Sequence, residues 1–250
     1  MLLVGASAAG AALIDLTPSR GTTITYDQAI FIEFTEAMQT SLSSGTGVID
    51  PFLTIQKKTL EEGFNSDAFP VLDATRPAWN RSIQISDLVT SPDLPTYYEF
   101  LLDINEPAGN KSLITQHALE VYLVPNGIGG AIATYADLQL SGTKIWDLDT
   151  DTLGDSQVLY DYNLWKGSGQ NIDAAFMLPT SLFSGSSLND YLYLYTQFGT
   201  LDRLGSPSQA GFEEYALRER EAPVPEPATM LLLGCGLIGL AGFGRKKLIK

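Results

Sequence analysis

The amino-acid sequence predicts a mainly β protein: an antiparallel, jelly-roll-like β-sandwich followed by a single C-terminal transmembrane helix. Short β-prone runs separated by turn residues recur through the body of the chain. No segment before residue 228 keeps a helical periodicity over about three turns. Residues 228–244 then form an apolar stretch without a charge, which indicates a membrane helix.

The predicted strands are runs rich in β-branched, aromatic and aliphatic residues. They cover residues 22–26, 30–34, 52–55, 82–85, 97–104, 119–124, 144–146, 157–160, 172–177, 191–198 and 211–217. Tyrosine and leucine alternate over residues 191–195, so the two residue types fall on opposite faces of one strand. Residues 41–50 and 60–78 are predicted to be surface loops. Many short strands at this spacing favour an antiparallel sandwich.

The composition is that of a folded, acidic protein. The 250 residues are 44% apolar and 18% charged, which is enough apolar material to bury a core. The formal net charge of −14 argues against nucleic-acid binding, because phosphate contacts need a basic surface. One cysteine and one histidine exclude a disulfide framework and zinc-finger sites.

The N-terminal residues 1–16 are small and apolar, and they predict a truncated signal peptide. Ala6-Ser7-Ala8 and Ala9-Gly10-Ala11 fit the small-x-small pattern of a cleavage site. The sequence has no basic residue before Arg20, although a secretory signal begins with a basic region. A buried first segment of the domain is therefore the alternative. Residues 17–221 are predicted to form the exported β-sandwich domain.

The C-terminal tail has three consecutive parts. Residues 222–227 contain three prolines, which favour an extended linker. The uncharged stretch 228–244 spans roughly 25 Å as a helix, at about 1.5 Å per residue, which is close to the lower limit for crossing a bilayer. Arg245, Lys246 and Lys247 follow it, and the positive-inside rule places this basic end in the cytoplasm.

Residues 222–250 resemble a PEP-CTERM sorting signal. They contain its three parts in the same order: the tripeptide Pro225-Glu226-Pro227, the apolar stretch and the basic end. The resemblance implies that exosortase, a membrane cysteine protease, processes the protein at the motif. It also implies export by a Gram-negative-type bacterium, with transient anchoring in the inner membrane through the C-terminal helix. The final location would be the cell surface or the extracellular space.

Segments of the body resemble the ectodomains of some PEP-CTERM proteins. These segments are residues 100–107, 146–149, 191–199 and 211–215. Those ectodomains have no assigned activity, so the resemblance implies a location and a β fold but no catalytic residue.

The densest acidic cluster comprises Asp147, Asp149, Asp151 and Asp155. Alternate carboxylates on a loop suit Ca²⁺, which takes about six to eight oxygen ligands. The spacing departs from an EF-hand loop, because Thr152 replaces the turn glycine and Val158 replaces the bidentate glutamate. The cluster is therefore either a Ca²⁺ site of another kind or a solvated acidic turn.

Other polar residues give little support to catalysis. Asp103, Asn105 and Glu106 end a predicted strand, where such residues commonly form Asx-type turns. His117 is the single candidate imidazole base, Cys235 lies in the apolar stretch, and no Gly-x-Ser-x-Gly motif is present. We therefore predict a protein that is not an enzyme. A secreted glycoside hydrolase with paired carboxylates stays open, since 29 acidic residues offer many pairs.

Trp79, Trp146 and Trp165 are candidate glycan-binding residues, because aromatic rings have a broad apolar face that can stack on a sugar ring. The tyrosines of residues 191–195 form a second candidate face, and ordinary core packing is the alternative for both. The leading functional prediction is an exported, exosortase-processed surface or matrix protein without catalytic activity. It would work in the extracellular polysaccharide of a biofilm. A Ca²⁺-dependent carbohydrate-binding module is the alternative.

Overall fold

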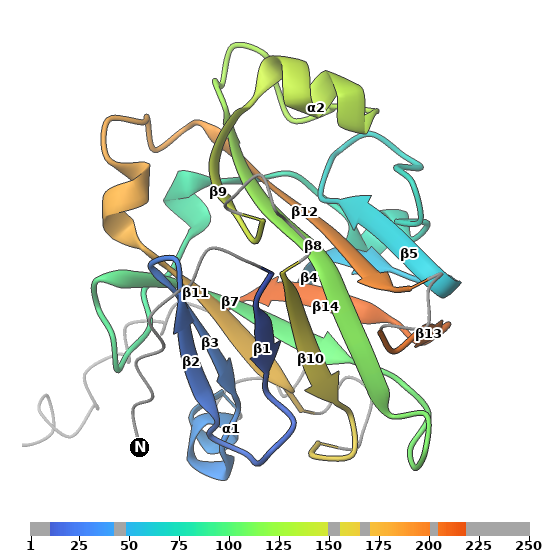
Figure 1. The fold of residues 1–250 in the computed structure, drawn as a ribbon. Coiled ribbons are helices and arrows are strands. Elements are labelled where there is room, and N and C mark those ends of the chain that lie inside the picture. Colours follow the sequence, from blue (N-terminus) through green and yellow to red (C-terminus); the bar gives the residue numbers. More distant parts are fainter. Residues whose placement is uncertain (1–10, 43–48, 150–155, 166–170, 201–204, 219–250) are drawn as a thin grey trace, which may run out of the picture. The chain divides into compact units, whose positions relative to one another are not determined.

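Two β-sheets form most of the protein, as Figure 1 shows for the computed structural model. The structure describes residues 11–42, 49–149, 156–165, 171–200 and 205–218. The chain divides into two units, residues 1–218 and residues 219–250. The first unit contains every strand reported below, and the prediction of a mainly β protein is confirmed. Its sheets are not purely antiparallel, because the first strand pairs in parallel with its neighbour.

Sheet 1 is nearer the viewer in Figure 1. Its strands in spatial order are β1 (Leu13–Asp15), β10 (Gln157–Asp161), β8 (Leu113–Val124), β12 (Tyr191–Gly199), β5 (Lys58–Phe64) and β13 (Ser208–Gln209). Two short strands extend it, since β6 (Ile83–Gln84) pairs with β12 and β9 (Thr143–Asp147) pairs with β8. Only the β1–β10 pair is parallel among the pairings of this sheet in the described residues.

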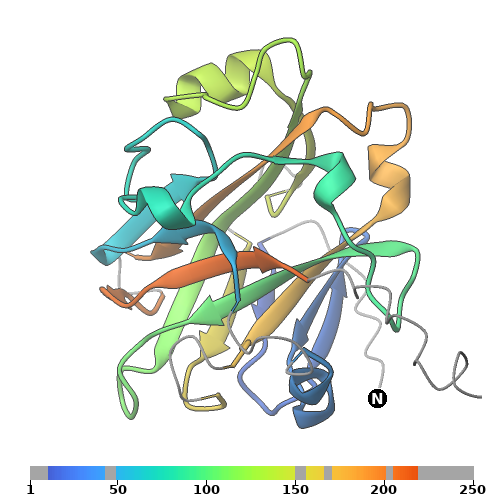
Figure 2. The ribbon, with the colours of Figure 1, turned by 180° about the vertical axis from the view of Figure 1, so that it is seen from behind.

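Sheet 2 faces the viewer in Figure 2. Its strands in spatial order are β2 (Thr23–Tyr26), β3 (Ala29–Glu33), β11 (Ala174–Pro179), β7 (Tyr97–Ile104), β14 (Glu213–Leu217) and β4 (Pro51–Ile55). All of these pairs are antiparallel. The last strand of the unit, β14, therefore lies inside the sheet, between two strands that come much earlier in the chain.

The main hydrophobic core lies between the two sheets. Phe176 of β11 packs against Phe31 of β3 and Phe100 of β7, with ring centroids 5.2 and 5.7 Å apart. Leu192 and Leu194 of β12 join the same core from sheet 1. Fully burying each such side chain stabilises the fold by about 1.5–3 kcal/mol relative to an exposed one, so contacts of this kind hold the sheets together.

The alternation predicted for residues 191–195 is confirmed. Leu192 and Leu194 face the core between the sheets, whereas Tyr193 and Tyr195 face the opposite side of sheet 1. There they pack in a second cluster with Leu138 of the helix α2 (Tyr135–Ser141). This helix lies across one end of sheet 1 (Figure 1), with the Thr134 hydroxyl accepting the Asp137 N–H at 3.1 Å as an N-cap.

Sheet 2 also has an outer cluster, because its strands bury both faces. The helix α1 (Glu36–Leu42) packs there beside Leu101 and Met177. Each helix has 7 residues, about two turns, so neither produces the three-turn periodicity by which a helix would be predicted from the sequence. In the described part of the chain, three 3₁₀ turns complete the regular structure: η1 (Pro77–Trp79), η2 (Ile85–Asp87) and η3 (Thr180–Phe183).

A hydrogen-bonded network crosses the core around Gln116 of β8. The Tyr160 hydroxyl donates to Gln116 Oε1 at 2.9 Å. Gln116 Nε2 donates to the Thr196 hydroxyl at 2.8 Å and to the Tyr215 hydroxyl at 2.6 Å. All four residues are buried, and Tyr215 belongs to sheet 2 while the others belong to sheet 1. The network therefore fixes one sheet against the other.

The N-terminal boundary differs from the sequence prediction. Residues 13–15 form β1, which pairs with β10, and Ile14 and Leu16 are buried in the main core. Residues 13–16 thus belong to the folded domain, as in the alternative of a buried first segment. Residues 1–10 lie outside the described residues, and a signal peptide within them stays a prediction.

The prediction of a surface loop over residues 60–78 is wrong at its start. Residues 58–64 form β5, which pairs with β12 on one side and β13 on the other. The run Glu61-Glu62-Gly63 has low β propensity, but pairing within the sheet overrides it. Of the loop predicted at 41–50, residues 41–42 end α1 and 43–48 lie outside the described residues.

No helix among the described residues is long and apolar enough to span a membrane. The helix predicted over residues 228–244 lies outside those residues, so the transmembrane prediction is not tested by the fold.

Candidate functional site

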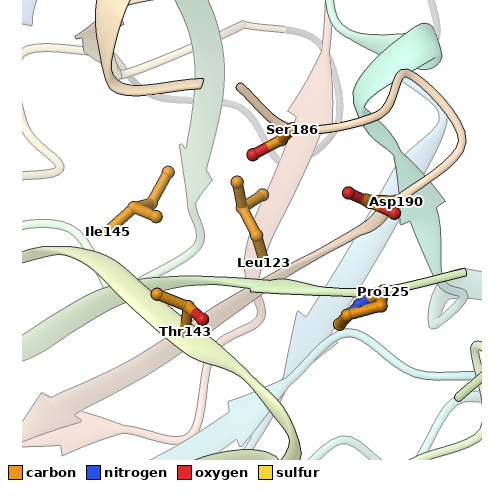
Figure 3. Close-up of a pocket in the computed structure, with 6 residues that line it drawn as sticks. All are labelled: Leu123, Pro125, Thr143, Ile145, Ser186 and Asp190. Carbon is orange, nitrogen blue, oxygen red and sulfur yellow. The ribbon is translucent and has the colours of Figure 1, made fainter. Parts of the chain in front are cut away.

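A small cavity opens between the end of β8, β9 and the turn after η3 (Figure 3). Its lining residues are Leu123, Pro125, Thr143, Ile145, Ser186 and Asp190. Its volume is about 150 Å³, smaller than the roughly 300 Å³ or more of pockets that hold small-molecule ligands. The Asp190 carboxylate accepts the N–H groups of Asn126 (3.2 Å) and Ser187 (2.9 Å). Its charge thus holds two turns in place.

The described half of the acidic cluster binds protein groups. Asp147 Oδ2 accepts a 2.5 Å hydrogen bond from Lys144 Nζ, and Asp147 Oδ1 accepts the Asp149 N–H at 3.0 Å. Asp149 Oδ1 in turn accepts the Ser156 N–H at 2.8 Å. Among the described residues no three metal-ligating side chains come together. Asp151 and Asp155 lie outside them, and the Ca²⁺ site stays a prediction.

Lys144 links this turn to Glu120 of β8. Its ammonium group lies 3.2 Å from Glu120 Oε1, and Glu120 Oε2 accepts the hydroxyls of Tyr122 and Tyr135 at 2.6 Å each. Burial lowers the pKa of Lys144, but the hydrogen bond to Asp147 and the Glu120 charge raise it above its ordinary value. Lys144 therefore stays charged and the cluster stays paired at neutral pH.

The tyrosine face of β12 is covered rather than open to a ligand. Tyr135 of α2 stacks on Tyr195 with ring centroids 4.2 Å apart. The Tyr195 hydroxyl donates to Glu62 Oε2 at 2.7 Å. Tyr193 is fully buried and donates to the Gly129 carbonyl at 3.3 Å. These tyrosines anchor α2 on the sheet, as in the core-packing alternative.

The three tryptophans lie in different environments. Trp146 is 4% exposed and donates to the Asp27 carbonyl at 3.0 Å. Trp165 is 6% exposed beneath the Arg20 guanidinium, which lies 3.8 Å from the ring centroid. Both therefore have structural roles in this fold. Trp79, at the end of η1, is 41% exposed.

Trp79 belongs to a small surface group that also contains the exposed Arg76 and the half-buried Phe212. The Trp79 and Phe212 rings meet edge to face at 6.3 Å, and the Arg76 guanidinium lies 5.2 Å from the Phe212 centroid. Trp79 comes from η1 and Phe212 from the turn before β14. We refer to these three residues as the Trp79 surface.

The predicted Asx-type turn at Asp103, Asn105 and Glu106 is largely buried in the fold. Asp103 and Glu106 are both buried, and both Glu106 oxygens accept the Gln209 N–H, at 2.9 and 3.0 Å. A Cβ on Gly211 would lie 1.7 Å from the Asn105 carbonyl oxygen, so only glycine allows this backbone crossing. This group therefore joins the end of β7 to the segment that leads into β14.

Sequence reasoning missed a set of carboxyl groups between the sheets: Glu33, Glu61 and Glu213 are all buried. Burial, followed by the nearby Asp161 charge, raises the pKa of Glu33 to about 9. The burial of Glu213 could have been predicted from the alternation of side chains along residues 213–217. In a strand Glu213 shares a face with Tyr215, which is a core residue.

The predicted sorting residues lie in the second unit, outside the described residues. Residues 223–246 match the family model of the PEP-CTERM protein-sorting motif. The chain carries a PEP-CTERM sorting motif. The matched range includes Pro225, Glu226 and Pro227, and the prediction made from them is confirmed.

The PEP-CTERM motif is the exosortase recognition signal and implies export with membrane-linked, exosortase-dependent sorting in Gram-negative bacteria. The matched range ends within the basic residues, after Arg245 and Lys246 and before Lys247. A search of curated proteins and a search of solved structures each found no significant match to the chain. The motif thus indicates the sorting route of the protein and says nothing about the role of the β domain.

Proposed function

We propose that this protein is an exported, exosortase-processed protein that acts at the cell surface or in the extracellular matrix without catalysing a reaction. The sorting motif at residues 223–246 carries this proposal. The position of β14 supports it, because the strands of the β unit end at Leu217, before the motif begins. Processing at the motif would release every strand of the domain.

The test of processing replaces Pro225, Glu226 and Pro227 together with alanine in an exosortase-bearing host. The triple variant is expected to remain full-length in the membrane fraction, while the parent chain is processed and released. Pro223→Ala is the matched control, because it changes a linker proline and keeps the tripeptide. Processing of the triple variant at the parental rate would contradict the proposal.

The same proposal gives the tail three roles. The extended residues 222–227 present the tripeptide, the apolar residues 228–244 cross the inner membrane, and the basic end stays in the cytoplasm. Replacing Arg245, Lys246 and Lys247 with glutamine is expected to reduce correct insertion. Accessibility of an introduced cysteine at the C-terminus to a membrane-impermeant reagent measures this directly.

We also propose a jelly-roll-like connection for the two sheets. Its support is that early and late strands lie side by side in each sheet: β3 beside β11 and β4 beside β14 in sheet 2, and β1 beside β10 in sheet 1. Such neighbours arise when a long β-hairpin folds over on itself. Because β1 and β14, the first and last of these strands, each pair within a sheet, the domain depends on residues near both ends of its described part.

Carbohydrate binding is a second candidate function, and the exposed Trp79 surface favours it. An exposed indole beside a second ring and a guanidinium is suited to stack on a sugar ring and to donate hydrogen bonds to its hydroxyls. A polysaccharide of the extracellular matrix would be its ligand, and a Ca²⁺ dependence of this binding would reside at Asp147 and Asp149.

Affinity electrophoresis in gels that contain exopolysaccharide tests this second function. Trp79→Ala is expected to lose at least about tenfold in affinity, as removal of one stacking contact of about 1.4 kcal/mol implies. Leu140→Ala is the matched control, because Leu140 is an apolar side chain that is 85% exposed on α2. Equal mobility of the Trp79 variant and the parent in these gels would reject the Trp79 surface as the binding site.

A further inference from the structure

Two carboxyl groups meet in the core from opposite sheets. Glu61 lies on β5 of sheet 1 and Glu213 on β14 of sheet 2, and each is 0% exposed. Glu61 shares the inner face of β5 with Gly63, which lies against the core residue Ile55. Glu213 shares the inner face of β14 with Tyr215. The two side chains are within hydrogen-bonding reach of each other.

The pair has few other donors. Glu61 Oε2 accepts the Lys57 N–H at 2.6 Å. Within the described part of the chain, no N–H or hydroxyl is hydrogen-bonded to Glu61 Oε1 or to either oxygen of Glu213. Ionised carboxylates only accept hydrogen bonds, so two of them cannot bond to each other. The contact between Glu61 and Glu213 therefore becomes a hydrogen bond only when one of them holds a proton.

The charges that face the pair are also negative. Asp73 and Glu106 face Glu61, and Glu106 and Asp103 face Glu213. Lys57 is a nearby cation, but its ammonium group pairs with Asp73 at 3.1 Å and its side chain is more than half exposed. The Ser208 hydroxyl lies within hydrogen-bonding reach of Glu61, and both it and the Tyr215 hydroxyl are uncharged at neutral pH. This environment favours retention of a proton by the pair.

We propose that Glu61 and Glu213 form a proton-held clasp between the two sheets, closed while the pair retains one proton and released when both groups ionise as the pH rises. This inference does not depend on the proposed function. It adds a conformational response to pH that acts on the segment leading into β14.

The segment affected by the clasp is defined by its contacts. β13 pairs with β5 at Ser208–Thr59 and Gln209–Lys58, close to Glu61 in the chain. The Gln209 N–H donates to Glu106, and the Ser208 hydroxyl donates to the Lys57 carbonyl at 2.8 Å. β13 lies at the edge of sheet 1 (Figure 1). Repulsion within the ionised pair would therefore loosen β13 first.

The direction of the pH effect follows from the proton that the folded state keeps. Burial is the largest cause that raises the pKa of both groups, and it raises that of Glu213 well above its ordinary value of 4.5. The unfolded chain releases this proton near pH 4.5. The clasp thus contributes its full stability below that pH and loses it as the pH rises.

The experiment measures chemical unfolding of the full-length chain in detergent micelles between pH 5 and pH 8. One proton retained only in the folded state makes the unfolding constant rise by up to tenfold per pH unit. The slope of the logarithm of the unfolding constant against pH should be smaller for Glu213→Gln than for the wild type, by about one proton. Asp93→Asn is the matched control, because Asp93 is exposed in the loop before β7. Its slope should equal that of the wild type.

Either of two results with the Glu213→Gln variant would overturn the clasp. One is an equal pH slope for wild type and Glu213→Gln. The other is restoration of high-pH stability by Ca²⁺ in wild type but not in Glu213→Gln, which would mark a cation site instead. If Glu213→Gln does not fold, hydrogen exchange of wild type decides: the amides of Ser208 and Gln209 should lose protection relative to Leu138 as the pH rises. Constant relative protection rejects the proposal.

Discussion

Replacing Gln116 with leucine removes the centre of the hydrogen-bonded network that joins the two sheets. The side chain makes three bonds: it accepts from Tyr160 at 2.9 Å and donates to Thr196 at 2.8 Å and to Tyr215 at 2.6 Å. Each such bond contributes about 1 kcal/mol net, which gives about 3 kcal/mol for the three. The leucine restores apolar contacts but leaves the buried Tyr160 hydroxyl without its acceptor, so we expect a loss of about 2–4 kcal/mol.

The assay is urea unfolding at constant pH, followed by tryptophan fluorescence. A double-mutant cycle with Tyr160→Phe isolates the pair, because the double variant no longer strands the Tyr160 hydroxyl. We expect the double variant to be more stable by about 1–2 kcal/mol than the sum of the two single losses predicts. A Gln116→Leu loss below about 0.5 kcal/mol, or strictly additive variants, would refute the view that this network holds the sheets together.

Three further predictions concern single positions. Glu33→Gln should remove a pH dependence of the unfolding free energy of about 1.4 kcal/mol per pH unit between pH 5 and 8. The reason is that the pKa of Glu33 is raised to about 9, so its stabilisation is present below pH 4.5 and lost as the pH rises. Parallel curves of stability against pH for the variant and the wild type would contradict this. Gly211→Ala should cost about 3 kcal/mol in thermal or chemical unfolding, because its Cβ would meet the neighbouring backbone. Gly127→Ala, where the added Cβ meets nothing within 4 Å, should change stability by less than about 0.5 kcal/mol, and similar losses at both glycines would refute the steric argument. Thr134→Ala should cost about 1 kcal/mol and increase hydrogen exchange in α2, and unchanged exchange there would show that the cap is dispensable.

The sequence predicted best where local pattern and tertiary environment agree. Residues 191–195 alternate between tyrosine and leucine, and the two residue types are buried on opposite faces of the strand as this alternation predicts. Residues 58–64 were missed because Glu61, Glu62 and Gly63 carry no β signal, and their strand is created by pairing with β12. Local sequence does not contain such long-range pairing.

The candidate sites were less predictable because burial decides their chemistry. Trp79, Trp146 and Trp165 are equivalent in composition, yet only Trp79 is substantially exposed in the fold. Asp147 was predicted from its spacing, but Lys144, three residues earlier, already neutralises it. The sorting motif could be predicted from the sequence because its residues are contiguous in the chain, so the match over residues 223–246 does not depend on the fold.

The position of β14 makes the completion of sheet 2 depend on the last strand of the domain in chain order. β4 pairs with β14 and with no other strand in the described residues, so it has no partner until residues 213–217 arrive. A chain exported from its N-terminus would therefore keep an open sheet edge during most of its passage and close it shortly before the sorting motif emerges. Completion of sheet 2 and arrival of the sorting motif would therefore occur close together in time. A domain with sheet 2 complete would be one whose strands have all been exported.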